Sequence, residues 1–141
     1  MILIERGENM DKRQMGWNKI REIAGEQGVK TMEAVQAYSP RLANMALEFG
    51  YGDIYSNDTL DSRQRALITL SSLISQGDHG TALIFHFKAA LRVGLTKEEI
   101  LELINHCSGY VGFPKAIASL NLFQQAYSEF ENEREDVSLS E

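Results

Sequence analysis

The chain contains one cysteine and two prolines in 141 residues, and it has no long apolar run. A single cysteine cannot form an internal disulfide, so the fold does not depend on oxidation and a cytoplasmic location is expected. No apolar stretch approaches the roughly 20 residues that a membrane-spanning helix needs. The first residues lack the basic and apolar segments of a signal peptide. Residues 1–10 are expected to form a flexible or artificial extension, because Met10 could be a second start.

Basic residues are scarce as well. Lys and Arg number 14 against 20 Asp and Glu, which gives a formal net charge of −6. Because phosphate groups favour a basic face, we expect no nucleic-acid partner, and without an apolar span we expect no membrane partner. Dinucleotide-binding, P-loop and nucleophile-elbow motifs are also missing from the sequence.

The scarcity of proline and of strand-like alternation predicts an all-α, single-domain bundle of about six to seven helices. The helical domain is expected over residues 11–131, followed by a polar, frayed tail over 132–141. Thr96 and Glu99 have the spacing of a capping box and predict a helix from Lys97 to about Ser108. The other expected helices cover residues 11–25, 31–37, 41–49, 62–76, 82–93 and 115–131. A loop is expected over residues 50–58.

All three histidines lie in the second half of the chain, at His79, His86 and His106. His79 and His86 are seven residues apart, and His106 and Tyr110 are four apart, so each pair would share a face of an unbroken helix. A pocket between the two helices could gather these rings against an apolar wall of Leu83, Phe87 and Ile104. Histidine suits proton transfer near neutral pH. The alternative for His86 is a satisfied core residue, and no zinc-type ligand spacing is present, so no metal is expected.

Arg65 and Lys115 are candidates for binding a carboxylate. Arginine offers a forked donor that matches a carboxylate, although Arg65 could instead form a structural ion pair with Asp61. Lys115 follows Gly112-Phe-Pro114, where free backbone N–H groups at a helix start could bind an anion. Structural need alone would also explain that turn.

Cys107 is expected near the C-terminal end of its helix, where the helix dipole disfavours a thiolate. A small buried apolar residue is the simpler interpretation. The alternative is a one-cysteine, thiol-dependent peroxidase.

Four segments carry a resemblance to a known family: residues 61–70, 86–91, 94–102 and 109–114. In this order and spacing, over roughly residues 48–129, the chain resembles the carboxymuconolactone decarboxylase family. Its AhpD-like thiol enzymes carry a Cys-x-x-Cys before the matching histidine, where this chain has His79 and Ala82. The resemblance is therefore to the decarboxylase-like branch.

The resemblance implies an AhpD-like helical bundle that assembles as a homotrimer or homohexamer. It also implies cofactor-free loss of CO2 from 4-carboxymuconolactone or a similar carboxylated lactone of aromatic catabolism. His86 would be the principal acid/base or oxyanion donor, with His79 and Tyr110 as further catalytic candidates. Arg65 would hold a substrate carboxylate, with His106 and Lys115 as further substrate-binding candidates. A different small-acid or lactone enzyme, a non-catalytic oligomeric binding protein, and a peroxidase using Cys107 stay open as alternatives.

Overall fold

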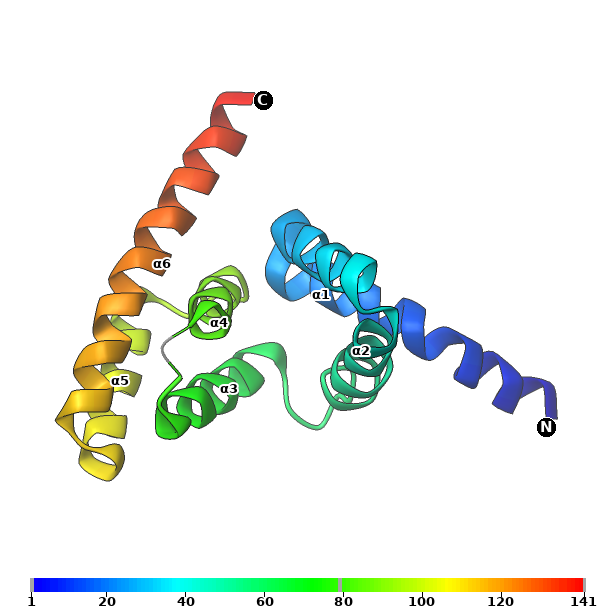
Figure 1. Ribbon diagram of the computed structural model, residues 1–141, viewed down its shortest axis with the longest axis horizontal. Coiled ribbons are helices and arrows are strands. Elements are labelled where there is room, and N and C mark those ends of the chain that lie inside the picture. The colour runs from blue at the N-terminus through cyan, green and yellow to red at the C-terminus, as the bar shows by residue number, and fades with distance from the viewer. Residues whose placement is uncertain (1, 79, 141) are drawn as a thin grey trace. The chain divides into compact units, whose positions relative to one another are not determined.

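The computed structural model describes residues 2–78 and 80–140, with side chains over 12–78 and 80–139, and every element in this part is a helix. The predicted all-α class is confirmed. The helices group into two compact units, Met1–Ser62 and Arg63–Glu141 (Figure 1). The helices α1 and α6 run without interruption across the two expected boundaries, at residues 10/11 and 131/132.

The first unit consists of α1 (Ile2–Tyr38), α2 (Pro40–Met45) and the π-helix η1 (Ala46–Ile54). Helix α1 bends sharply at Gly25, whose φ of 66° lies in the left-handed region that glycine tolerates best. The predicted end of a helix at this glycine is therefore confirmed, but the next helical stretch begins at once. Pro40 opens α2, as expected for a proline in the first turn of a helix.

The prediction of a loop that begins at Gly50 is wrong as far as Ile54, because residues up to Ile54 belong to the π-helix η1. Packing against α1 explains the helix. An added Cβ at Gly52 would lie 2.8 Å from the carbonyl oxygen of Lys12, and one at Gly16 would clash with that of Leu47. The two backbones thus approach closely over small residues, beside a core of Ile20, Val29 and Leu47.

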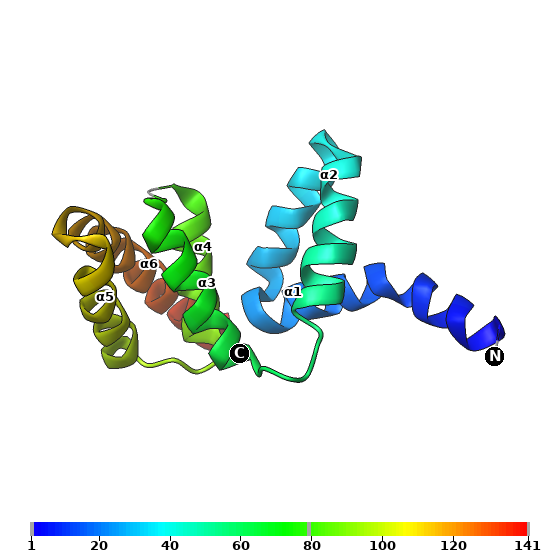
Figure 2. The ribbon, with the colours of Figure 1, turned by 90° about the horizontal axis from the view of Figure 1, so that it is seen from below.

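The second unit consists of α3 (Ser62–Gln76), α4 (Thr81–Arg92), α5 (Lys97–Val111) and α6 (Phe113–Ser140). The α4 and α5 helices each pack against α6 (Figure 2). The capping box is confirmed: Thr96 Oγ1 accepts the Glu99 N–H at 3.0 Å, and Glu99 Oε1 accepts the Thr96 N–H at 3.0 Å. The core of this unit contains Leu70, Ile74, Leu83, Phe87, Ala90, Leu95, Ile100, Leu103, Ile104, Cys107, Ala116, Phe123 and Ala126.

From the sequence, residues 132–140 are expected to form a frayed tail. The structure instead continues α6 as a helix through this segment. Lys88 of α4 reaches this extension, because its Nζ lies 3.0 Å from carboxylate oxygens of both Glu129 and Glu133. These contacts from a distant segment stabilise a stretch whose own sequence is polar. In the described part of the chain, none of the helices has the length and apolar character needed to cross a membrane.

Candidate functional site

His86 lies on α4, one position before the buried Phe87, and its side chain is largely withdrawn from solvent. The Phe85 ring meets the imidazole edge to face, with centroids 5.0 Å apart. Burial lowers the pKa of His86 to about 4, and the nearby Asp78 carboxylate only partly opposes this effect. At neutral pH the ring is therefore uncharged and presents one N–H donor and one nitrogen acceptor.

Asp78 occupies the turn between α3 and α4 and is fixed by two hydrogen bonds. Its Oδ1 accepts the Gly80 N–H at 2.8 Å, and its own N–H donates to the Leu73 carbonyl at 3.0 Å. The turn thereby holds a carboxylate near the imidazole of His86. The sequence prediction did not single out this residue, although Asp-x-Gly is the pattern of an aspartate-capped turn. His79, the next residue, lies outside the described residues.

His106 and Tyr110 share one face of α5, as their spacing predicts. Their ring centroids lie 5.3 Å apart with planes at 30°, and both side chains are exposed, Tyr110 by 82%. Among the described residues, no ring contact or hydrogen bond joins this pair to His86. The structure therefore brings His106 and Tyr110 together on α5.

The pocket predicted between α4 and α5 would be lined by residues of the core of the second unit. Its proposed wall residues Leu83, Phe87 and Ile104 are at most 4% exposed. The Phe87 ring packs against Phe123 of α6 at 5.1 Å between centroids. Both α4 and α5 pack on α6, and a pocket between α4 and α5 stays a prediction.

Arg65 and Lys115, the two candidate carboxylate-binding residues, differ in their surroundings. Arg65 lies on α3 and is partly buried. Lys115 is exposed, and its Nζ donates to the Ser75 carbonyl at 3.1 Å, so it caps the last turn of α3. This contact gives Lys115 a structural role, in line with the alternative that the Gly112–Pro114 turn serves the fold and not anion binding.

Cys107 is 7% exposed and belongs to the core of the second unit. Its environment is that of a small apolar core residue. Within the described part of the chain, no three His, Cys, Asp or Glu side chains gather in a way that could hold a metal ion.

Comparison with known proteins gives a match between residues 40–125 and the profile of the carboxymuconolactone decarboxylase family. A 4-carboxymuconolactone decarboxylase from Acinetobacter baylyi is 29% identical over 109 residues, which cover 77% of this chain and 81% of the relative. A 15.0 kDa protein of Paracoccus denitrificans is 30% identical over 103 residues, covering 72% of this chain and 77% of its own. A nitrosuccinic acid decarboxylase from Metarhizium robertsii is 30% identical over 82 residues, covering 58% of this chain and 57% of the relative.

Proposed function

Since the chain belongs to the carboxymuconolactone decarboxylase family, we propose that it is a decarboxylase that acts without a cofactor on a carboxylated γ-lactone of aromatic catabolism. The preferred substrate is 4-carboxymuconolactone. Support comes from the family match and from two similar proteins whose names are those of decarboxylases.

The reaction needs an electron sink and a proton. The bond between the ring carbon and the carboxylate breaks, CO2 leaves, and the electron pair moves through the conjugated ring to the lactone carbonyl. The resulting dienolate is protonated on carbon, so that one CO2 leaves and one proton enters. Donors that stabilise the developing oxyanion lower the barrier to this step.

The observation that carries the proposal is the neutral, largely buried imidazole of His86. A histidine with a pKa of about 4 holds no imidazolium proton near pH 7, so of the two roles expected for it, we favour the oxyanion donor. A neutral imidazole can donate its N–H to a developing enolate oxygen, and its low-dielectric surroundings strengthen that hydrogen bond.

The other candidates have complementary tasks in this proposal. Arg65 binds a substrate carboxylate through its forked donors. Tyr110, paired with His106, supplies the proton, and His79 and Lys115 are further candidates for catalysis and substrate binding, respectively. A cytoplasmic location is part of the same proposal.

We also propose that the chain assembles as a homotrimer or homohexamer. Next to Tyr110, the side chains of Phe113 and Ile117 are 70% and 56% exposed, which is unusual for large apolar residues on a solvated face. Light scattering coupled to size exclusion should therefore give a mass of three or six chains. A monomer at micromolar concentration would contradict the assembly without affecting the decarboxylase assignment.

CO2 release from 4-carboxymuconolactone, generated in situ, tests the activity. We expect rapid release that falls by about 10²–10³ in His86→Ala, the usual effect of losing one oxyanion donor. Arg92→Ala, an exposed change on the same helix, is the matched control and should retain full activity. Release at the uncatalysed rate by the unmodified protein would refute the proposed substrate.

A small nitro or carboxylic acid is the second candidate substrate, favoured by the similarity to a nitrosuccinic acid decarboxylase. The apolar residues Leu83, Ile84 and Phe85 before His86 also suit a smaller, less charged substrate. Nitrosuccinate should then release CO2 where the lactone does not. Saturable binding of either acid without turnover would instead indicate a binding protein.

A further inference from the structure

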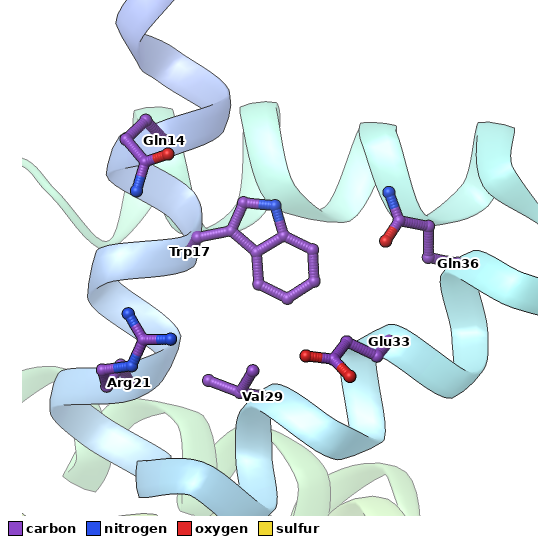
Figure 3. Close-up of a pocket in the computed structure, with 6 residues that line it drawn as sticks. All are labelled: Gln14, Trp17, Arg21, Val29, Glu33 and Gln36. Carbon is purple, nitrogen blue, oxygen red and sulfur yellow. The ribbon is translucent and has the colours of Figure 1, made fainter.

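The bend of α1 at Gly25 creates a pocket within the first unit, on residues that the proposed catalysis does not use. Gln14, Trp17 and Arg21 lie on one face of the stretch before Gly25, and Val29, Glu33 and Gln36 on one face of the stretch after it. Figure 3 shows these two faces turned toward each other, with the Trp17 indole projecting into the space between them. The cavity has a volume of about 560 Å³.

The indole of Trp17 is held by the core of the first unit. It packs with the core residues Ile20, Val29 and Leu47, and Val29 is 5% exposed at the base of the pocket. A rigid aromatic surface is thus available to a ligand without the loss of much side-chain entropy. The faces of aromatic rings carry negative potential and attract cations, most strongly in tryptophan.

The charges around the indole also favour a cation. Arg21 Nε lies 3.0 Å from Glu26 Oε1, so a neighbouring carboxylate offsets this positive charge. Among the described residues, Glu33 forms neither a hydrogen bond nor an ion pair, and Figure 3 shows its carboxylate across Val29 from Arg21. The amide oxygens of Gln14 and Gln36 can accept hydrogen bonds. A chain with a net charge of −6 further concentrates cations at its surface.

The geometry points to a second binding site, at which Trp17 and Glu33 hold a small organic ammonium ion. The ammonium group lies against the indole face and pairs with the Glu33 carboxylate, while the glutamine amides bind its polar substituent. The pocket residues precede the range matched by the family profile, residues 40–125, and the ligand charge is opposite to that of the proposed acid substrate. This site is therefore independent of the proposed catalysis.

Trp17 is the only tryptophan of the chain, so its fluorescence reports directly on the pocket. Choline is the probe, titrated into the full-length protein at constant ionic strength, and 3,3-dimethylbutan-1-ol is its uncharged isostere. We expect a saturable change in fluorescence with choline at millimolar concentration, and no such change with the alcohol. Equal responses to both compounds, or none to choline, would overturn the proposal.

Two variants test the charges. Glu33→Gln should weaken choline binding about threefold to fivefold, the effect of losing one exposed ion pair. Glu26→Gln should also weaken it, because the Arg21 charge is then no longer offset. Glu48→Gln, an exposed carboxylate of η1 outside the pocket, is the matched control and should bind as the unmodified protein does. Unchanged binding in Glu33→Gln, with a folded protein by circular dichroism, would contradict the assignment.

Discussion

Arg63 and Glu99, 36 residues apart in sequence, form an ion pair in which Arg63 Nη2 lies 2.8 Å from Oε2 and 3.1 Å from Oε1 of Glu99. The same guanidinium donates from Nη1 to the Gly94 carbonyl at 3.2 Å. The hydrogen bond from the Thr96 backbone N–H and the charge of Arg63 both hold the pKa of Glu99 below its usual value. One side chain of α3 thus fixes the start of α5.

Replacing the two arginines should separate a structural role from a substrate-binding one. Arg63→Ala should lower the thermal midpoint by about 1–3 °C, because the pair is half exposed, and leave KM unchanged. Arg65→Ala should raise KM for the carboxylated lactone about tenfold, because a charge-assisted hydrogen bond is lost. Thermal unfolding and steady-state kinetics on both variants provide the measurement. A KM effect in Arg63→Ala alone would reverse the assignment.

His86 should make the stability of the protein depend on pH between about 4 and 6.5. Its folded-state pKa of about 4 lies below the unfolded value of 6.5, so the unfolded chain takes up the proton first as the pH falls. The contribution of the neutral His86 side chain to the free energy of unfolding is complete above pH 6.5 and is lost as the pH falls toward 4. Its size is on the order of 3 kcal/mol at most. Urea unfolding at several pH values should show a shallower dependence in His86→Gln.

The exposed His106 supplies the control for this measurement. His106→Gln is the same substitution at an exposed position of α5. The pKa values of Glu99 and Glu129 are lowered in the folded state, so these residues lose their contribution to the free energy of unfolding below about pH 4.5. This loss is the same in all three proteins and cancels when their pH dependences are compared. Identical pH dependence in His86→Gln and the unmodified protein would exclude a neutral buried imidazole.

The close approach of α1 and η1 should make Gly16 intolerant of a side chain. Gly16→Ala should destabilise the protein by about 1–3 kcal/mol, because its Cβ meets the Leu47 carbonyl and the helices must separate. At Gly50 an added Cβ meets nothing within 4 Å, so Gly50→Ala should be neutral or stabilise by up to about 1 kcal/mol. Chemical denaturation followed by Trp17 fluorescence compares the two. Equal effects would indicate that the helices separate without cost.

Cys107 should be chemically inert in the folded protein. A thiol that is 7% exposed should react slowly with a disulfide reagent until denaturant exposes it. Cys107→Ser should retain decarboxylation, since the proposed chemistry uses no thiol. Hydroperoxide reduction that needs a thiol and disappears in Cys107→Ser would restore the peroxidase alternative.

Local sequence signals predicted the helices well wherever the stabilising contacts are themselves local. The Thr96–Glu99 capping box specifies the start of α5 within four residues, and both its hydrogen bonds are present. The π-helix and the end of α6 depend on distant partners instead. Gly52 looks like a helix breaker until the backbone of α1 is placed against it, and residues 132–140 look disordered until Lys88 is placed beside Glu133.

The same distinction applies to the candidate site. The sequence singles out His86, but its uncharged state comes from burial, which the local sequence pattern does not reveal. The shared face of His106 and Tyr110 follows from helix geometry alone.

The two units have separate hydrophobic cores of unequal size, so they should differ in how readily they open. Among the described residues, the buried cluster at the core of the first unit has three members, whereas that of the second has thirteen. Local opening is least costly where few apolar contacts are broken, so backbone amides of residues 12–54 should exchange hydrogen sooner than those of α4 and α5. The Trp17 pocket then belongs to the more readily opened part of the chain. A cation bound there would slow exchange across the first unit and leave the proposed catalytic residues unaffected.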